Sequence, residues 1–410
     1  MIQTLKNYLW HLPKAVVSSA RYGFPAQKLT VIGVTGTKGK TSTSHMIYHI
    51  LRIYGRGKVG LISTIGVFFS AKGGSAFSGG DEDIDTGLHV TSPDSRELQK
   101  LLRMAMDKGL TYVVLEVTSS GLDQFRVWGI KFKVSVITNI YPDHLDYHGT
   151  MEKYVAAKKK IINQSEAAVI PRDLPYFRKE GRGKKEEGRR KIVEFESGIS
   201  IVSANRAAAM AAVKVLGVPE VEAVNALKDF KGVRGRLEVV YQDKFLVVID
   251  FAHTPESLAA ALGELRKFVK RNGRLIAVFG CAGGRDHGRR RMGEVAAKMA
   301  DLFVITAEDP RTETVEEISN EIVDYARKAG AVEITKLTNE QTNKRTNKSE
   351  FIRIPDRQEA INYAISLAKE GDVVGLFGKG HEKSMCFGKK EMPWSEYEAV
   401  HRALDSIRRK

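Results

Sequence analysis

Apolar segments alternate with amphipathic ones along the chain, and their lengths fit strands followed by helices. In the first half, the predicted strands are Leu29–Val34, Tyr112–Glu116 and Val134–Thr138. The predicted helices of that half begin at Lys40, span Ser95–Lys108 and begin again near Thr150. Strands that alternate with helices form a mostly parallel sheet with helices on both faces, so we predict an α/β fold.

A second alternating set begins after Gly235-Arg236. Its predicted strands are Phe245–Asp250, Arg274–Phe279, Leu302–Thr306 and Asp372–Phe377. Its predicted helices are Pro255–Lys270, Gly288–Ala300, Val315–Lys328 and Arg357–Ala368, with a last one capped by Ser395 and Glu398. The pattern indicates a separate α/β domain. We therefore place an N-terminal helical segment at 1–28, a first domain at 29–231 and a second at 232–410.

The first 28 residues carry Ile2, Leu5, Leu9 and Leu12 at roughly helical spacing. Two interpretations fit this pattern, a helix that lies in a membrane surface and a cap that packs on the first domain. The sequence pattern alone leaves both open.

The composition is that of a globular protein with more than one domain. Of the 410 residues, 42% are hydrophobic and 28% charged, and no apolar run approaches the ~18 residues that span a bilayer, so we expect a cytoplasmic protein. With only Cys281 and Cys386, a disulfide framework and a four-cysteine zinc site are excluded. The net charge of +16 suits acidic ligands such as nucleotides. The basic run 178–191 fits a solvated loop. The sequence has no helix-turn-helix or RNA-stacking motif, so we do not expect nucleic acid as a partner.

The segment Val31–Thr41 runs from an apolar strand into a glycine-rich turn that ends in Gly39-Lys40-Thr41. Such a turn directs backbone N–H groups and a helix N-terminus at a phosphate chain, with Lys40 as a point charge and the Thr41 hydroxyl as a Mg²⁺ ligand. It predicts a nucleoside triphosphate site. The common pattern has a glycine five positions before Gly39, where this chain has Val34.

A carboxylate and an imidazole follow two further predicted strands, Glu116 in LEVTSSGL and His144 in TNIYPDHLDYHG. Ligands of an open α/β sheet lie at the carboxyl ends of its strands, so the glycine-rich turn, Glu116 and His144 can converge. A carboxylate and an imidazole beside a triphosphate suggest a metal site.

A series of motifs occurs in the order and spacing of the Mur ligases, which the chain resembles from about Val31 to its end. They are Thr35–Thr41, Glu116–Leu122, Thr138-Asn139, Asp143–Gly149, Ala156–Lys158, Gly235-Arg236, Asp250–Pro255, Phe279–Asp286, Asp309–Arg311 and Gly378–Glu382. The resemblance implies a P-loop central domain with a mostly parallel sheet and a C-terminal Rossmann-like α/β domain. Within the family the chain looks most like the MurE ligases, which add the third amino acid to UDP-N-acetylmuramoyl-L-alanyl-D-glutamate in peptidoglycan precursor synthesis.

The resemblance also implies a reaction and its cofactors. A substrate carboxylate attacks the γ-phosphate of ATP to give an acyl phosphate, which an amine then converts to an amide, with ADP and phosphate released. The implied cofactors are ATP and Mg²⁺ at two sites, and the implied partners are small molecules, a nucleotide-sugar peptide and an amino acid. We expect a monomer.

Site residues follow from the same resemblance. The resemblance implies catalytic roles for Lys40, Glu116, His144, Lys158 and Arg236. It implies that the metal ions are bound by Thr41, Glu116, His144 and Lys158. Lys158 matches a lysine that the family carbamylates. Expected nucleotide contacts are Gly36, Thr37, Lys38, Gly39, Lys40, Thr41, Ser42, Asn139, Arg236, Asp250, His253 and Asn205, the last of these opening a helix Ser203–Leu216. The acceptor is expected at Thr91, Ser92, Thr118, Gln124 and Arg126, and the incoming amino acid at Arg285, Asp309, Arg311, Gly378 and Glu382.

The chain departs from the family pattern in ways that bear on its substrates. MurE enzymes usually have a whole N-terminal domain for the uridine nucleotide, and only 28 residues precede the first strand here, so we expect another way of binding UDP or a different acceptor. Asp309 replaces the asparagine of a motif associated with diaminopimelate, which leaves lysine and diaminopimelate both open. The alternatives are a Mur-like ligase for a folylpolyglutamate-type or lipid-linked acceptor and a non-catalytic basic nucleotide-binding protein.

Overall fold

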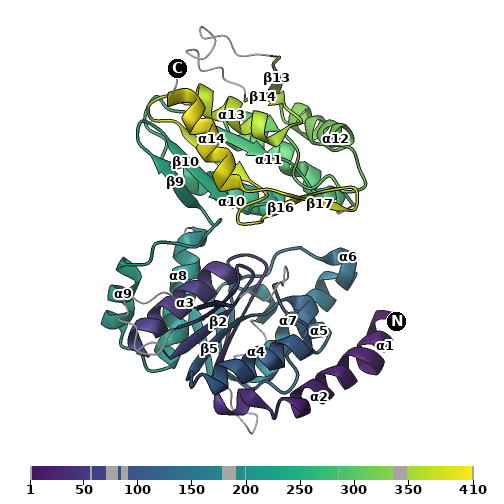
Figure 1. The fold of residues 1–410 in the computed structure, drawn as a ribbon, viewed down its shortest axis with the longest axis vertical. Helices are drawn as coiled ribbons and strands as arrows, with labels where there is room; N and C mark the ends of the chain where they lie inside the picture. Colours follow the sequence, from purple (N-terminus) through teal and green to yellow (C-terminus); the bar gives the residue numbers. More distant parts are fainter. Residues whose placement is uncertain are drawn as a thin grey trace. The chain divides into compact units, whose positions relative to one another are not determined.

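The computed structural model describes residues 2–55, 58–70, 82–84, 91–177, 191–198, 200–284, 286–335 and 349–408. The chain divides into two compact units, Met1–Lys231 and Gly232–Lys410 (Figure 1). The basic run 178–191 lies, except for its last residue, outside the described residues. None of the described helices is long and apolar enough to serve as a transmembrane span.

The first unit is built on an eight-stranded sheet. In spatial order its strands are β4 (Glu82–Ile84), β3 (Val67–Phe69), β2 (Val59–Ile62), β5 (Tyr112–Glu116), β1 (Thr30–Thr35), β6 (Phe132–Ile137), β7 (Ser165–Pro171) and β8 (Lys191–Phe195). Neighbours from β2 to β8 pair in parallel, and β3 pairs antiparallel with β2 and β4.

Helices cover both faces of this sheet. The helices of the first unit are α1 (Ile2–Lys6), the π-helical turn η1 (Asn7–His11), α2 (Leu12–Arg21), the 3-10 turn η2 (Pro25–Lys28), α3 (Lys40–Tyr54), α4 (Ser95–Asp107), α5 (Ser119–Asp123), α6 (Leu145–His148), α7 (Met151–Asn163), the 3-10 turn η3 (Pro175–Phe177), α8 (Ile201–Val215) and α9 (Glu220–Lys228). Val31 and Val113 pack with α4 and α7, and Ile32 and Val114 pack with α3, α8 and α9. Successive strand residues point to opposite faces, so strands buried on both sides read as continuous apolar runs.

The second unit repeats this plan around a seven-stranded sheet. Its strands are, in spatial order, β13 (Val332–Glu333), β14 (Glu350–Arg353), β12 (Leu302–Ile305), β11 (Leu275–Phe279), β15 (Val373–Phe377), β10 (Leu246–Asp250) and β9 (Glu238–Gln242), with only β9 antiparallel to its neighbour. Its other elements are α10 (Pro255–Arg266), the 3-10 turn η4 (His287–Arg291), α11 (Met292–Met299), α12 (Val315–Lys328), α13 (Arg357–Leu367), α14 (Glu396–Arg408) and the antiparallel ribbon of β16 (Ser384–Phe387) and β17 (Lys390–Pro393). Helices α10, α11 and α12 pack on one face, and α13 and α14 on the other.

The topology gathers the predicted motifs at the carboxyl ends of the strands. In the first sheet, β5 and β6 flank β1, with Val34 paired to Glu116 and Thr35 to Ile137. In the second sheet, Asp250 at the end of β10 pairs with Phe377 at the end of β15. The loops that follow these strands therefore share one edge in each sheet, where open α/β sheets bind ligands.

The α/β prediction is confirmed, with differences in some helix bounds. The helix that begins at Pro255 ends at Arg266 rather than Lys270, because the Lys270 amide donates to the Gly371 carbonyl instead of back into the helix. The predicted helix Gly288–Ala300 begins as the 3-10 turn η4, which turns the Arg290 side chain into the interior, and continues as α11.

The start of α8 also differs from the prediction. Ser200 Oγ caps this helix by accepting a hydrogen bond from the Ser203 amide, and Ser203 Oγ accepts one from the Ser200 amide. The helix therefore begins at Ile201, and Asn205 lies in its second turn instead of opening it.

Candidate active site

The glycine-rich loop between β1 and α3 has two positions where its conformation and its close contacts require glycine. Gly36 has φ of +152° and Gly39 φ of +79°, where residues with side chains are strained. A Cβ on Gly36 would lie 1.9 Å from Thr138 Oγ1, and one on Gly39 would lie 2.0 Å from Asn205 Oδ1. Glycine is therefore required at both positions, and Asn205 is placed directly against the loop.

Neighbouring side chains hold the loop through its backbone. The Asn139 side chain accepts from the Lys38 amide at 2.8 Å and donates to the Lys38 carbonyl at 3.0 Å. Thr138 Oγ1 donates to the same carbonyl at 2.6 Å, and Thr37 Oγ1 lies 2.9 Å from the Tyr154 hydroxyl. Asn139, expected to contact the nucleotide, here has its amide group engaged in shaping the loop.

Two lysines meet at the Gly36 carbonyl. Lys158 Nζ donates to it at 2.8 Å and Lys40 Nζ at 3.2 Å, and Lys40 also donates to the Thr37 carbonyl. Lys158 is buried, and burial together with the charge of Lys40 holds its pKa well below the usual range. A lysine with a lowered pKa has a larger fraction of neutral, nucleophilic amine.

Glu116 ends β5 as a buried carboxylate beside α3. Its two oxygens accept from Thr41 Oγ1 at 3.0 and 3.1 Å, and Oε2 also accepts from the amide and hydroxyl of Thr64 at 3.0 and 2.9 Å. Among the described residues, no lysine or arginine forms an ion pair with it, although a buried carboxylate ordinarily has a cationic partner. Hard oxygen donors around an uncompensated charge fit Mg²⁺. Sequence analysis did not single out Thr64, which orients the carboxylate.

His144 lies at the start of α6 with φ of +53°. Its side chain is half-exposed, and partial burial with the charges of Lys40 and Lys158 lowers its pKa, although Asp143 acts in the other direction. A lowered pKa favours the neutral imidazole that binds metal ions. The structure thus joins Thr41 to Glu116 directly, whereas no hydrogen bond between described residues joins His144 to either Glu116 or Lys158.

The residues expected to hold the acceptor form a connected network in the first unit. Ser92 Oγ accepts from the Thr118 amide at 2.9 Å, and the Ser92 carbonyl accepts from Arg126 Nη1 at 2.6 Å. Arg126 Nη2 donates to Gln124 Oε1 at 2.7 Å. Thr91 Oγ1 accepts from Thr64 Oγ1 at 3.0 Å, which links this network to the carboxylate of Glu116.

The described residues expected to hold the incoming amino acid gather around the buried Lys379. Its Nζ lies 2.8 Å from Asp309 Oδ1 and 2.7 Å from Glu382 Oε2, and Arg311 Nη2 lies 3.9 Å from Asp309 Oδ2. Burial acts to lower the pKa of Lys379, but the charges of Glu382 and Asp309 outweigh it and raise the pKa. Gly378, with φ of +103°, adjoins this group. Arg285 lies outside the described residues.

Glu308 belongs to this group of residues and was not predicted. Its Oε2 is buried without a hydrogen-bond partner among the described residues, and a Cβ on Gly378 would lie 2.8 Å from it. Burial raises the pKa of Glu308 to about 7 against the opposing charges of Lys379 and Arg357. Glu308 and Lys379 each adjoin a predicted residue, which is the only signal of them in the sequence.

The second unit also holds three of the expected nucleotide residues, grouped around Phe251. The Arg236 guanidinium carbon lies 4.5 Å from the centre of the Phe251 ring, and His253 Nδ1 lies 2.8 Å from the Phe251 carbonyl oxygen. The Asp250 carboxylate accepts from the backbone amides of Leu237 and Ala252, each at 2.8 Å. Asp250 therefore shapes the turn that carries Arg236.

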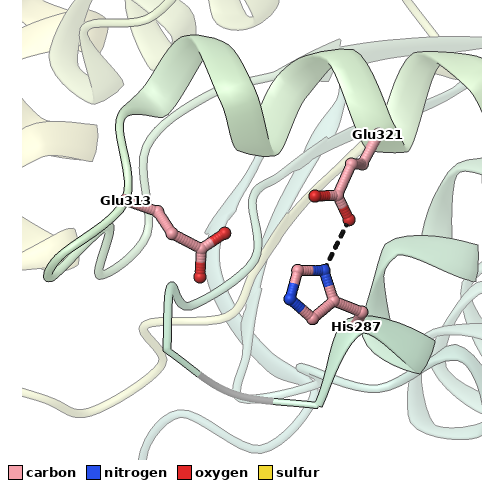
Figure 2. Close-up of side chains that lie close together, drawn as sticks. All are labelled: His287, Glu313 and Glu321. Atoms are coloured by element: carbon pink, nitrogen blue, oxygen red, sulfur yellow. Dashed lines mark hydrogen bonds and ion pairs between the residues drawn. The ribbon is translucent and has the colours of Figure 1, made fainter.

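Within the described residues, one group of histidine and carboxylates has ligand atoms close enough to share a metal ion: His287, Glu313 and Glu321 (Figure 2). His287 Nδ1 lies 2.8 Å from Glu321 Oε2. The fully buried Arg290 lies 2.9 Å from Glu313 and 3.6 Å from Glu321, so a guanidinium already compensates both carboxylates. Glu313 also accepts from the Gly284 amide. The group is an ion-pair network that holds Gly284 and His287 beside the start of α12.

Comparisons with known proteins agree with this geometry. The Mur ligase middle domain matches residues 34–214, and the glutamate ligase domain of the Mur ligases matches residues 235–380. The UDP-N-acetylmuramoyl-L-alanyl-D-glutamate--2,6-diaminopimelate ligases of Thermosynechococcus vestitus and Aquifex aeolicus are 34% and 35% identical to the chain, and both alignments cover 95% of it and 79% and 81% of the relatives. A solved structure of a ligase with the same name aligns with a TM-score of 0.59 at 27% identity, over 93% of this chain and 79% of that one. The chain is therefore a member of the Mur ligase family, whose enzymes use ATP to form amide bonds.

Proposed function

We propose that the protein adds 2,6-diaminopimelate to a UDP-N-acetylmuramoyl-L-alanyl-D-glutamate-type acceptor at the expense of ATP, in peptidoglycan precursor synthesis. The names of its relatives support the acceptor and the amino acid. The observation that carries the choice of amino acid is the group of charged side chains around Lys379. The Arg311 side chain is partly exposed and can donate to a distal carboxylate, while Asp309 and Glu382 can accept from an ammonium. Diaminopimelate has both distal groups, whereas lysine has only the ammonium.

Like charges must meet in this reaction, because a carboxylate attacks a phosphate. Lys40 begins α3, and we propose that it offsets the charge of the β- and γ-phosphates. Mg²⁺ held by Thr41 and Glu116, and by Glu116, His144 and Lys158 at a second site, would supply further positive charge. The bond between the γ-phosphorus and its bridging oxygen breaks as the carboxylate oxygen bonds to phosphorus. The amine then attacks the acyl carbon, loses a proton and expels phosphate.

Lys158 is proposed to act as a carbamate. Its burial and lowered pKa support this, because the neutral amine attacks CO₂, forms a nitrogen–carbon bond and releases a proton. The product is an anion beside the cationic Lys40, suited to a metal ion. Arg236, Asp250, His253 and Asn205 are proposed nucleotide contacts by their correspondence to the family.

The proposal extends to the organisation of the protein. We take 29–231 and 232–410 as its two functional domains and expect it to act as a monomer. Contact of residues 1–28 with a membrane is part of the proposal, and the exposed face of that segment supports it.

A product assay tests the proposed function. The protein, ATP, Mg²⁺ and UDP-N-acetylmuramoyl-L-alanyl-D-glutamate are incubated separately with diaminopimelate, lysine and ornithine, and the products are weighed by mass spectrometry. Phosphate release should require both acceptor and amino acid, and diaminopimelate should give the main product. If no product formed, the proposed acceptor would be wrong. If lysine were preferred, the proposed choice of diaminopimelate would be wrong. An Arg311→Gln variant should raise the KM for diaminopimelate more than for lysine.

A further inference from the structure

The helical segment that opens the first unit has its polarity reversed. A helix packed on a globular unit normally turns its apolar side inward and its polar side to solvent. Here Asn7 and Ser19 are 3% and 1% exposed, whereas Leu9, Trp10 and Val17 are 68%, 67% and 65% exposed. Large apolar side chains therefore face outward along the segment 2–21.

Polar contacts fix this orientation. Asn7 Nδ2 donates to Asp123 Oδ2 at 2.7 Å, and Ser19 Oγ donates to the Trp128 carbonyl at 3.2 Å. Lys14 pairs with Asp94 at 3.3 Å. Helix α2 packs along α4 at the outside of the first unit (Figure 1). Turning the helix over would bury its apolar side but break these hydrogen bonds, so the outward face is a built feature.

Five large apolar side chains of this segment are exposed. We call Leu5, Leu9, Trp10, Val16 and Val17 the outward face. Leu9 and Trp10 belong to the π-helical turn η1, and Val16 and Val17 belong to α2. Several large apolar side chains exposed on one short segment mark an interaction site rather than scattered exposure.

Charge indicates what the outward face contacts. Residues 1–28 contain Lys6, Lys14, Arg21 and Lys28 and neither aspartate nor glutamate. Two copies of such a helix would repel each other across a symmetric contact. An anionic lipid surface instead offers hydrocarbon to the apolar side chains, an interface for the Trp10 ring and phosphates for the cations.

We propose that residues 2–21 lie in the plane of an anionic membrane surface and hold the protein there. This rests on and specifies the membrane contact proposed above, and it does not depend on the ligase reaction. The segment is also linked by hydrogen bonds to Gln124, a residue of the expected acceptor site. The Tyr147 hydroxyl accepts from Gln3 Nε2 at 3.3 Å and from Gln124 Nε2 at 3.2 Å. Membrane binding therefore brings the expected acceptor site next to lipid.

Vesicle co-sedimentation of the full chain, without substrates, tests the proposal. The protein should sediment with vesicles of equimolar phosphatidylcholine and phosphatidylglycerol, and much less with phosphatidylcholine alone. Val17→Glu should lower the partition coefficient by about tenfold, because it removes a valine that would enter the lipid and adds a charge that the lipid repels. Val221→Glu is the matched control, since Val221 is 71% exposed on α9 and should leave binding unchanged.

Other outcomes would overturn the proposal. Equal binding by the two variants would show that another surface contacts lipid. An oligomer in sedimentation velocity without lipid, dissociated by Val17→Glu only, would assign the outward face to a second copy. Both valines are exposed, so unfolding temperatures should match. Independently, lipid should shift the tryptophan emission to shorter wavelength in the wild type and not in Trp10→Phe, and a shift retained in that variant would contradict contact through the helix.

Discussion

Replacing Glu308 by glutamine should stabilise the second unit at alkaline pH and leave its stability almost unchanged at acid pH. Burial raises the pKa of this carboxyl from 4.5 to about 7 in the folded state. Below pH 4.5 it is protonated in both the folded and unfolded chains and does not oppose folding. As the pH rises, the unfolded chain ionises first, so folding is increasingly disfavoured until both states are ionised above about pH 7.

The interval between the two pKa values gives the size of the effect. Each pH unit is worth about 1.36 kcal/mol, so the interval from 4.5 to about 7 amounts to roughly 3 kcal/mol. Glutamine has nearly the same shape and cannot ionise. A poor contact of its amide with Lys379 would shift the stability equally at every pH, so the dependence on pH is the signature.

Tryptophan fluorescence can follow the second unit alone. Of the three tryptophans, only Trp394 lies there, so a background with Trp10→Phe and Trp128→Phe reports urea unfolding of that unit. Wild type and Glu308→Gln are compared at about pH 5 and about pH 8. The same difference in unfolding free energy at both pH values would refute the reasoning. Glu370→Gln, at an exposed carboxyl, is the matched control.

Three further substitutions test other parts of the structure. Gly36→Ala should raise the Kd for ATP, measured by calorimetry, at least tenfold, because its Cβ would clash with Thr138. Gly217→Ala, where a Cβ would meet nothing within 4 Å, should leave the Kd unchanged. Equal effects of the two substitutions would contradict a role for Gly36 in the loop. Lys158→Met should lower kcat by about a hundredfold or more and abolish any carbamate signal seen by ¹³C NMR with labelled bicarbonate; full activity would remove this lysine from catalysis. Arg357→Met should lower the unfolding free energy by about 3–5 kcal/mol, because it leaves the buried Glu396 without its cation. Adding Glu396→Gln should recover part of the loss. A loss below about 1 kcal/mol would show that the ion pair is not needed for stability.

Elements with local signals were predicted well. The strand Tyr112–Glu116 was predicted with its observed bounds, because a short apolar run ends there in a single carboxylate. Helix α12 likewise has a capping box at Thr314 and Glu317 and an amphipathic pattern up to Lys328. Such features depend on residues within a few positions of one another, so one sequence contains them in full.

The candidate site shows where local signals end. Lys379 is buried because Asp309, seventy positions away, and Glu382 compensate its charge, and spacing cannot reveal such a partner. Glu308 is buried at the same place, near Lys379 and Arg357, which are also distant from it in the sequence. The segment 2–21 gave the correct helical pattern, but only its contacts with Asp123 and Trp128 decide which side faces inward.

The loop after β1 has a consequence for how fast the protein takes up its nucleotide. The carbonyls of Gly36, Thr37 and Lys38 all accept hydrogen bonds from side chains of the chain itself, so the loop is shaped before a ligand arrives. Little conformational entropy remains to be lost there on binding. Association should then be limited by diffusion and charge rather than by a rearrangement of the loop. A slow ordering of this loop is therefore not expected before the chemistry.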